Sequence, residues 1–245
     1  THEHADALRD MGFNRLSMGV QDFTPEVQAV INRYQDEKQT RVLFDYCRQQ
    51  GFGSINIDLI YGLPLQTPAT FATNLDAVID MRPDRVAMYS FAFVPWKQGN
   101  QRLLTEDMML PPEVKVELYL LGLEKFTKAG YRLIGMDHFA LPEDELARAL
   151  ETRTLHRNFM GYTVKPATDA IAMGGSGIGD LQGAYVQNIK ENERYYQAVR
   201  EGRLPVFRGA LLSRDDQIRR YIITQLMCNL HLDRHDVEAR FGLDF

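Results

Sequence analysis

The sequence predicts an α/β protein in which parallel strands alternate with helices. Apolar strands are expected at residues 15–20, 54–60 and 85–93, with amphipathic helices between them. Short loops join these elements, as in strand–helix units that build a parallel sheet. Open doubly wound sheets and closed or partial barrels share this order of elements, so the pattern alone leaves both architectures open.

Two helices are expected between the first and second strands. Thr24 is the expected N-cap of the first helix, because a proline and a glutamate follow it in the first turn. The second helix is expected over residues 37–50, where apolar residues recur at helical spacing, and it ends at Gly51.

The second strand contains one ionisable residue, Asp58, in an otherwise apolar run. Residues 61–64 break this strand, and Thr67-Pro68 opens a helix that is expected to reach residue 81. A carboxylate near the carboxyl end of a parallel strand occupies the place where α/β barrels bind ligands. The alternative is that Asp58 only caps the following loop by bonding its backbone.

The strand–helix regularity weakens after about residue 140, and helices dominate from about residue 190. We therefore expect one domain at 1–195 and the start of a mainly helical domain at 196–245. The remaining expected elements are a loop at 94–112, helices at 113–129, 142–151, 190–202 and 213–230, a strand at 131–136, and another helix from residue 233.

Composition excludes several classes of protein. The chain has 245 residues, of which 44% are hydrophobic, so it can bury a sizeable core. The net charge of −5 provides no general basic field, and nucleic acid is therefore not an expected partner. The absence of a bilayer-length apolar run and of a disulfide framework favours a soluble protein of the cytoplasm.

The two ends of the sequence suggest a piece of a longer protein. The first residue is Thr1 and not methionine, and residues 5–11 read as the last turns of a helix that Gly12 caps. Residues 240–245 end without a terminal element of their own. We therefore expect a fragment that is cut on both sides.

Polar residues follow successive strands of the expected sheet. Gln21 and Asp22 lie just past the first strand, Arg33 lies at a helix end, and Asp58 lies near the end of the second strand. Gln21 and Asp58 are suited to hydrogen-bond a ribose, and Arg33 to bind a carboxylate with two parallel hydrogen bonds. The alternative is a rim of solvated polar residues without a ligand.

A glycine-dense segment lies at residues 170–181, with glycines at positions 174, 175, 177 and 179. The spacing does not match the dinucleotide-binding pattern G-x-G-x-x-G, because position 180 is aspartate. Close approach of the backbone to a ligand or to another chain is favoured over a plain turn.

Residues 157–159 combine a cation, an amide and an aromatic ring, as Arg157, Asn158 and Phe159. This set suits a ligand that has an apolar ring and carboxylates, but it equally suits an ordinary loop that Phe159 anchors.

The histidines do not predict a metal site. His138 follows a strand and stands next to Asp137, which favours a hydrogen-bonded structural role. His231 and His235 have the separation that helical zinc sites use, but no third ligand is evident.

Several segments together point to one family: QDF at 21–23, NRYQDE at 32–37, INIDLIYGLPLQT at 55–67, GMDHFALPEDELA at 135–147 and LHRNFMGYT at 155–163. They resemble the oxygen-independent coproporphyrinogen III oxidases, which are radical S-adenosylmethionine (SAM) enzymes of anaerobic haem biosynthesis. The haem-carrier relatives of that family share the segment INIDLIYGLP, whereas GMDHFA and HRNF favour the oxidase.

The resemblance implies a partial (β/α) barrel of radical SAM type, followed by the start of a mainly helical domain. It also implies a [4Fe-4S] cluster and two SAM molecules, whose radical chemistry converts two propionates of coproporphyrinogen III to vinyl groups with loss of CO2. A monomer that takes electrons from a donor and has no membrane or nucleic-acid partner is expected.

The resemblance assigns roles to residues only where this sequence matches the family pattern. It assigns no catalytic residue. It places Gln21, Arg33, Asp58 and Ala92 against the second SAM, Ile178 against the first SAM, and Phe159 near the active site, where Arg157 is the other expected substrate-binding residue.

Two departures from the family pattern affect this expectation. The three cluster cysteines of the family, C-x3-C-x2-C, are expected upstream of Thr1, and neither Cys47 nor Cys228 can replace them. No metal ligand is therefore expected in this chain. Met160 stands where the oxidase pattern has glutamine, and its thioether can fill the space but not replace the amide.

Two alternatives remain open beside the oxidase. One is a haem carrier that binds a tetrapyrrole without oxidising it. The other is an unrelated barrel lyase or aldolase, which would need a Schiff-base lysine at a strand end, and none is apparent.

Overall fold

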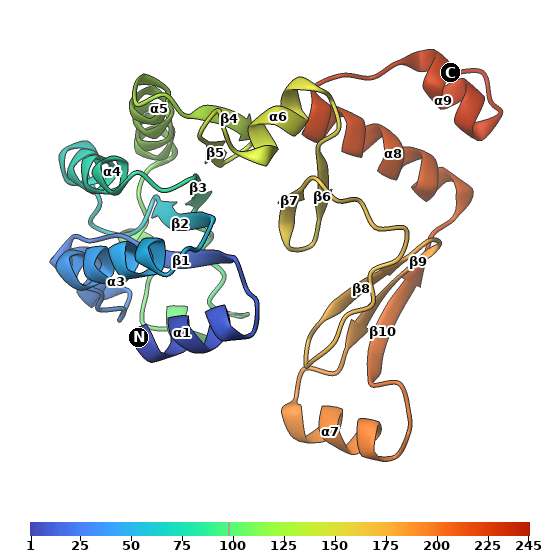
Figure 1. The fold of residues 1–245 in the computed structure, drawn as a ribbon, viewed down its shortest axis with the longest axis horizontal. Coiled ribbons are helices and arrows are strands. Elements are labelled where there is room, and N and C mark those ends of the chain that lie inside the picture. Colours follow the sequence, from blue (N-terminus) through green and yellow to red (C-terminus); the bar gives the residue numbers. More distant parts are fainter. Residues whose placement is uncertain (98) are drawn as a thin grey trace. The chain divides into compact units, whose positions relative to one another are not determined.

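The computed structural model describes residues 1–97 and 99–245, which form two compact units (Figure 1). The first unit is Thr1–Arg148 and the second is Ala149–Phe245. This division follows compactness, and the domain boundary expected near residue 195 stays a prediction. Gln98, in the loop expected at 94–112, lies outside the described residues.

The first unit contains a five-stranded sheet in the order β1-β2-β3-β5-β4. Its first three strands are parallel, and a hairpin of β4 and β5 completes it, with β5 antiparallel to β3. The strands are β1 (Arg15–Gln21), β2 (Ser54–Tyr61), β3 (Arg85–Ser90), β4 (Arg132–Gly135) and β5 (His138–Ala140).

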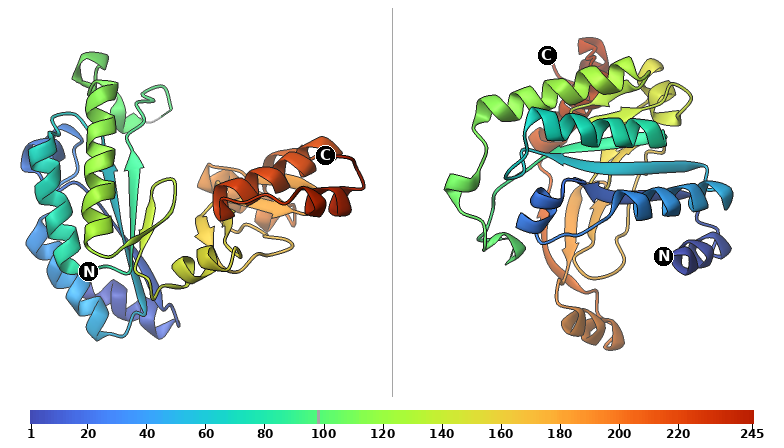
Figure 2. Two further views of the ribbon diagram at one scale, coloured as in Figure 1. Left: turned by 90° about the horizontal axis from the view of Figure 1, so that it is seen from above. Right: turned by 90° about the vertical axis from the view of Figure 1, so that its left-hand side faces the viewer.

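Helices connect the parallel strands, as the sequence predicts, and Figure 2 shows α3, α4 and α5 along one face of the sheet. Two short 3-10 turns, Gly99–Gln101 and Glu106–Met108, follow β3. The α-helices of this unit are α1 (His2–Asp10), α2 (Pro25–Val30), α3 (Glu37–Gln49), α4 (Pro68–Met81), α5 (Pro112–Lys128) and α6 (Glu145–Glu151), the last of which continues into the second unit.

Burial alternates along β2 and thereby distinguishes the two faces of the sheet. Ile55, Ile57 and Leu59 are fully buried beneath the helices. Asn56 and Asp58 point to the opposite face, where they are only half-buried. Asp58 is therefore on the open face of the sheet and not within the apolar layer.

Local sequence signals account for the ends of several helices. Thr67 and Thr70 form the capping box of α4, and Pro68 occupies its first turn. Thr24 is the N-cap residue of α2, as predicted, but its hydroxyl makes no capping bond and instead accepts one from Asn74 Nδ2 at 3.0 Å.

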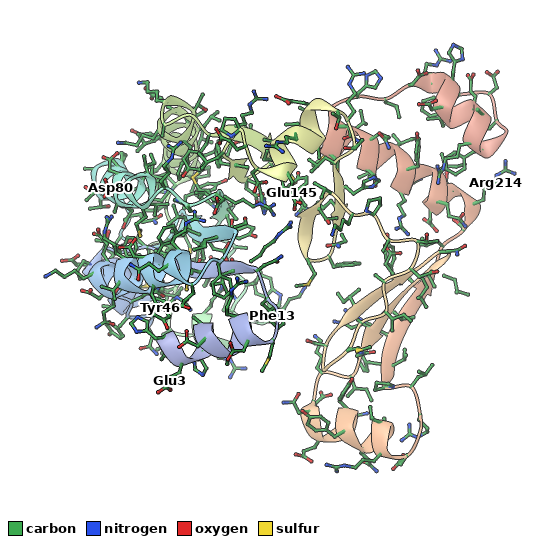
Figure 3. All side chains as sticks on the ribbon, in the orientation of Figure 1. Glu3, Phe13, Tyr46, Asp80, Glu145 and Arg214 are labelled. Atoms are coloured by element: carbon green, nitrogen blue, oxygen red, sulfur yellow. The ribbon has the colours of Figure 1, made fainter. Side chains whose placement is uncertain are left out.

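Helix α1 is attached to α3 through Tyr46 (Figure 3). The Tyr46 hydroxyl donates to Asp6 Oδ1 at 2.5 Å, and its ring stacks on His2 with the ring centroids 4.0 Å apart. The hydrogen bond to Asp6 and burial raise the pKa of Tyr46, because both favour the neutral phenol.

The second unit has more strand than the sequence predicts. Residues 156–163, for which the sequence predicts no strand, form a hairpin, and the glycine-dense segment leads into a three-stranded antiparallel sheet in the order β10-β9-β8. The elements are β6 (His156–Asn158), β7 (Gly161–Thr163), β8 (Ile178–Leu181), β9 (Ala184–Asn188), α7 (Asn192–Arg200), β10 (Val206–Leu211), α8 (Arg214–Asn229) and α9 (Arg234–Phe241).

Close approach of the backbone explains the glycine-dense segment. A Cβ on Gly179 would lie 3.0 Å from the carbonyl oxygen of Ala170, and one on Gly177 would lie 3.2 Å from that of Met173. The chain thus approaches its own backbone here.

In the described part of the chain, no helix is long and apolar enough to cross a membrane.

Candidate functional site

The candidate site lies where β1 and β2 end, at the carboxyl edge of the parallel strands. Gly19 of β1 is paired with Asp58 of β2, but the next pair joins Gln21 to Leu59, so Val20 is an extra residue on β1. Such β-bulges are common beside active sites, because they change the direction in which a side chain points. The bulge ends in Gln21, whose φ of 69° is a left-handed value that residues with a side chain rarely adopt.

Two polar side chains lie over Gly19. The Arg33 guanidinium donates from Nη2 to the Gly19 carbonyl oxygen at 2.5 Å. A Cβ on Gly19 would lie 2.8 Å from Gln21 Nε2 and 3.2 Å from Arg33 Nη2, so both groups lie over this glycine. The structure therefore brings together Gln21 and Arg33, two of the predicted site residues, and the third, Asp58, is the strand partner of Gly19.

Asp58 is held by neighbouring polar groups on the open face. Its carboxylate accepts hydrogen bonds from Asn56 Nδ2 at 2.6 Å and from Ser17 Oγ at 3.2 Å. Asn56 also donates to Ser17 Oγ at 2.9 Å. The carboxylate bonds side chains of the two strands and not the backbone of the following loop, so the loop-capping alternative is wrong.

A layer of buried polar side chains lies behind this edge. Asp22, Gln66 and Asn74 are 1%, 2% and 3% exposed. Asp22 Oδ2 accepts from Gln66 Nε2 at 2.7 Å, and Asn74 Oδ1 accepts from the Phe23 backbone N–H at 2.7 Å. The sequence predicts Asp22 at the rim but gives no role to Gln66 or Asn74. The signal for these two residues is an amide side chain in the loop and in the helix that follow an apolar strand.

Ala92 lies beyond the end of β3, at the same edge of the sheet. The preceding residue, Phe91, donates its N–H to the Tyr61 carbonyl at 2.8 Å and accepts from Lys115 Nζ at 2.9 Å. The Ala92 carbonyl accepts from Gln101 Nε2 at 3.0 Å. These bonds fix the backbone at Ala92, the fourth residue expected to contact the second SAM.

His138 lies in β5, opposite Ala87 of β3. Its Nδ1 is 2.7 Å from Asp137 Oδ1, and its ring meets that of Tyr89 edge to face at 5.7 Å. This hydrogen-bonded setting agrees with the structural role expected for His138.

The remaining predicted site residues belong to the second unit. Arg157 and Phe159 lie on the β6–β7 hairpin, where the Arg157 guanidinium lies 5.0 Å from the centre of the Tyr162 ring. The side chains of the turn are exposed, Phe159 by 60% and Met160 by 94%. The Phe159 ring also meets Tyr185 of β9 edge to face at 5.4 Å.

Ile178 is the first residue of β8 and is half-buried opposite Gln187 of β9. Two residues later, Asp180 accepts two hydrogen bonds from Arg220 of α8, at 2.9 and 2.6 Å. This bidentate ion pair joins the small sheet to α8.

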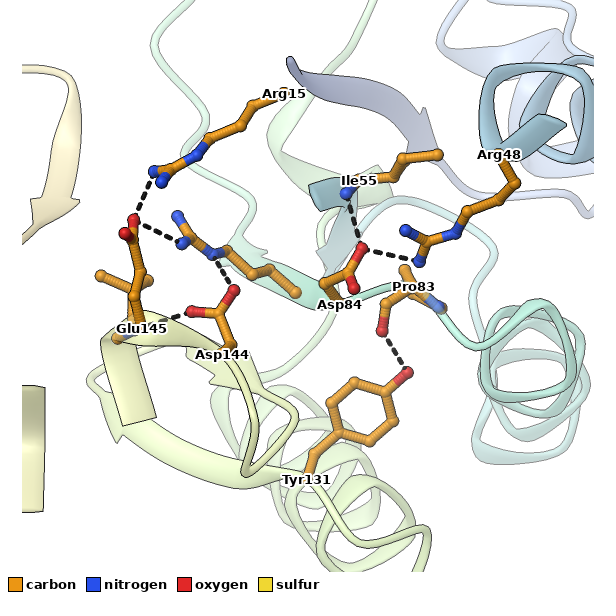
Figure 4. A network of polar contacts seen from close by, with 10 residues as sticks. Arg15, Arg48, Ile55, Pro83, Asp84, Tyr131, Asp144 and Glu145 are labelled. Atoms are coloured by element: carbon orange, nitrogen blue, oxygen red, sulfur yellow. Dashed lines mark hydrogen bonds and ion pairs between the residues drawn. The ribbon is translucent and has the colours of Figure 1, made fainter. Parts of the chain in front are cut away.

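A second polar cluster lies at the opposite edge of the first unit's sheet, where the parallel strands begin (Figure 4). Arg15 and Arg85 both bind Glu145, and Arg85 Nε also donates to Asp144 at 2.8 Å. Burial alone would raise the pKa of Glu145, but the hydrogen bonds from the two arginines outweigh burial and hold this pKa below its ordinary value.

Asp84 extends this cluster by accepting the Ile55 N–H at 2.7 Å and pairing with Arg48 at 2.6 Å. A pocket of about 470 Å³ lies here, lined by Arg15, Asp84, Arg85 and Glu145 among others. The charges of these four side chains are paired with one another or with neighbours, which favours a structural role for this cluster.

The described residues provide no metal centre. Within residues 1–97 and 99–245, no three His, Cys, Asp or Glu side chains are grouped so that they could hold a metal ion. Cys47 and Cys228 are both buried, and burial raises the pKa of each thiol. His235 is exposed and lies 3.3 Å from Glu238 Oε2.

Comparison with known proteins extends the sequence resemblance. A family model for the radical SAM superfamily matches residues 1–78. The oxygen-independent coproporphyrinogen III oxidase of Salmonella typhimurium is 48% identical over 240 residues, which are 98% of this chain and 52% of that protein. The protein of the same name from Helicobacter pylori is 43% identical over 245 residues, which are 100% of this chain and 54% of that protein. The chain spans about half the length of the curated relatives it matches.

A solved structure agrees with these sequence matches. Coproporphyrinogen III oxidase from Escherichia coli, described as a radical SAM enzyme, matches with a TM-score of 0.95 at 45% identity. The match covers 99% of this chain and 56% of that one. The α/β fold expected from the sequence is thus confirmed at the level of a mixed α/β fold, and a closed barrel is not present among the described strands.

Proposed function

Because this chain is a homologue of the oxygen-independent coproporphyrinogen III oxidases of the radical SAM superfamily, and spans about half their length, we propose that it belongs to an enzyme of that activity. The reaction would convert two propionates of coproporphyrinogen III to vinyl groups with loss of CO2. The names of the relatives favour this reaction over the haem-carrier alternative.

The observation that carries the proposal is that the Gln21 and Arg33 side chains lie together over Gly19, whose strand partner is Asp58. SAM has a carboxylate, an ammonium group and two ribose hydroxyls, and these three side chains offer matching groups. The Arg33 guanidinium can donate to the carboxylate, and the Gln21 amide and Asp58 carboxylate can bond the ribose hydroxyls. The chain's residues therefore fit SAM at this edge.

We assign this edge, with the backbone at Ala92, to the second of two SAM molecules, and Ile178 to the first. The sheet of the first unit would be part of an open (β/α) barrel of radical SAM type. When bound, SAM and a [4Fe-4S] cluster supply the one-electron chemistry that removes a hydrogen atom from a propionate side chain. The cluster does not fit the described part of this chain, which has no suitable group of ligands, so its cysteines would lie outside it.

The hairpin of the second unit is the proposed contact with the tetrapyrrole. The Arg157 guanidinium would pair with a propionate carboxylate, and the exposed Phe159 ring would pack against the macrocycle. Met160 adds a polarizable thioether beside that ring.

The substitution Asp58→Ala tests the proposed SAM site in the reconstituted holoenzyme. We expect the variant to lose one of two bound SAM molecules while the visible absorption of the cluster is unchanged, because Asp58 would contact ligand and not cluster. Equilibrium dialysis with labelled SAM measures the number bound. Binding of both molecules at wild-type affinity would return Asp58 to a structural role.

A further inference from the structure

The carboxyl edge of β1 holds Gln21 in a backbone conformation that needs support. Its φ of 69° lies in the left-handed region, which is unfavourable for a residue with a side chain. Such conformations persist where the surrounding structure imposes them, and they are common at ligand sites. The residue that follows Gln21 is the most deeply buried carboxylate of this edge, Asp22.

Each polar group of Asp22 is engaged. Its Oδ1 accepts the N–H of Thr24 at 2.6 Å, and its Oδ2 accepts Gln66 Nε2 at 2.7 Å. Its backbone carbonyl accepts Gln28 Nε2 at 2.8 Å, and its own N–H donates to the Val20 carbonyl at 2.9 Å. These bonds fix both the side chain and the backbone of Asp22, and the bond to Val20 spans the left-handed residue Gln21.

Gln66 connects this turn to the loop that follows β2. Its Nε2 also donates to the Ile60 carbonyl at 2.8 Å, and its Oε1 accepts the N–H of Leu63 at 3.0 Å. The Gln66 amide cannot rotate by half a turn without losing both of these bonds, so its N–H group necessarily faces the Asp22 carboxylate.

Gln28 connects the same turn to the segment that carries Arg33. Its amide donates to the Gln35 carbonyl at 2.7 Å and accepts the Gln35 N–H at 3.1 Å. Two residues earlier, Arg33 reaches Gly19 and lies 3.5 Å from Gln35 Oε1. The buried network formed by the side chains of Asp22, Gln66 and Gln28 thus holds the backbone on either side of the site. This backbone carries the two donors that lie over Gly19, the Gln21 amide and the Arg33 guanidinium.

We propose that Asp22 and Gln66 are positioning residues that hold the Gln21 amide and the Arg33 guanidinium together over Gly19 as a preformed pair of donors for SAM, the guanidinium for its carboxylate and the amide for a ribose hydroxyl. Gly19 has a matching role, because a side chain there would occupy the space of both donors. Preorganised donors bind an anion more tightly than mobile ones, since the cost of ordering them is met on folding. The proposal rests on the function proposed above and adds to it a source of affinity for SAM.

Two substitutions separate this role from a purely structural one. Asp22→Asn keeps the shape of the side chain but places an N–H group against the Gln66 N–H group, which breaks one buried bond. Gly19→Ala leaves the network intact and displaces only the ends of two flexible side chains. Asp84→Asn is the matched control, because Asp84 also accepts a backbone N–H, at the opposite edge of the sheet.

The experiment measures the dissociation constant of SAM in the reconstituted holoenzyme, with amide hydrogen exchange as a second readout. We expect Asp22→Asn and Gly19→Ala each to raise the constant of one SAM by about tenfold. Asp84→Asn is expected to leave it unchanged. Exchange at Phe23 and Thr24 is expected to quicken in Asp22→Asn and to stay as in wild type in Gly19→Ala.

Each outcome decides between the claims. If wild-type protein binds both SAM molecules and Asp58→Ala loses one, but Asp22→Asn binds both normally, the positioning role is wrong and the proposed site stands. If Asp58→Ala binds both molecules as wild type does, the proposed site itself is wrong. Should Asp22→Asn fail to fold, Gln66→Met replaces it in the same assay and is judged by the same criterion.

Discussion

At the scale of single residues, two glycines of the first unit are defined by what a side chain would displace. At Gly19 the neighbours are the ends of two polar side chains of the proposed SAM site. At Gly122 of α5 the neighbour is Met88 of β3, which is fully buried in the core. The same residue type thus lies in the proposed ligand site at one position and in helix–sheet packing at the other.

Gly122→Ala is expected to destabilise the protein although alanine is the better helix former. The new Cβ would lie 2.3 Å from Met88 Sδ, so the core must shift. Overpacking of a core typically costs about 1–3 kcal/mol. The gain in helix propensity from glycine to alanine is at most about 1 kcal/mol, so the cost of overpacking is the larger effect. Urea denaturation measures the change, and Glu117→Ala on the exposed side of α5 is the control. A more stable Gly122→Ala variant would contradict this packing argument.

The lowered pKa of Glu145 predicts how stability depends on pH. The folded-state pKa lies below the ordinary value near 4.5, so the contribution of Glu145 is present above that value and is lost as pH falls through the folded pKa. We expect Glu145→Gln to lower the free energy of unfolding by up to about 1 kcal/mol at neutral pH, because the side chain is partly exposed. Denaturation of both proteins across the acid range should show this difference vanish at low pH. A difference that persists there would have another cause than the ion pair.

At the scale of elements, the small sheet of the second unit depends on side chains that bond the backbone of the glycine-dense segment. Asn188 at the end of β9 is 6% exposed and donates to the carbonyls of Ala172 and Gly174, at 3.1 and 3.0 Å. The Tyr195 hydroxyl accepts the N–H of Gly174 at 2.9 Å. Hydrogen bonds from side chains therefore hold the backbone at residues 172–174, where the glycines provide no side chains to pack.

Asn188→Ala is expected to free this segment. Two half-buried carbonyls lose their hydrogen bonds from this side chain, which costs about 1–3 kcal/mol in total. Amide hydrogen exchange should quicken over residues 172–177 in this variant, and the thermal midpoint should fall. Lys190→Ala, at an exposed position nearby, is expected to change neither quantity. Unchanged exchange in Asn188→Ala would show that the glycine contacts suffice by themselves.

The elements that sequence reasoning found have strong local signals. Helices α3, α4 and α8 begin at side-chain caps on Asp36, Thr67 and Ser213, and each has an apolar face at helical spacing. The sequence does not predict strand β10, because VFRGAL shows no alternation of apolar and polar residues. In the structure every residue of β10 is exposed, so neither face of the strand needs to be apolar. Its pairing with β9 comes from distant residues.

At the scale of the whole molecule, the chain carries the edge that we propose for SAM but no group of metal ligands among its described residues. Its length is about half that of its curated relatives. The proposed SAM binding can therefore be tested on residues of this chain, whereas the activity of the relatives needs cluster ligands that the described residues lack.

The 245-residue chain alone is expected to form no vinyl product from coproporphyrinogen III, even with SAM, a reductant and iron–sulfur reconstitution. The physical reason is that two buried, separate cysteines cannot hold a cluster. Chromatography of the tetrapyrrole and analysis of bound iron and sulfide test this. Product, or a stoichiometric cluster that survives Cys47→Ser and Cys228→Ser, would show that other ligands exist.

The sequence by itself determined the three parallel strands of the first unit, the helices between them and the edge at which its polar groups gather, but it did not predict β5 or the hairpin that β5 forms with β4. Apolar periodicity and helix caps are local properties, and parallel strands necessarily end at one edge, so Gln21, Arg33 and Asp58 were predictable as a group. Tertiary structure decided the details on which binding depends. The β-bulge at Val20, the left-handed Gln21 and the bond between Asp22 and Gln66 arise from register and burial between segments 44 residues apart in the chain. No local pattern encodes such a pairing, because its energy exists only once the two loops are packed together.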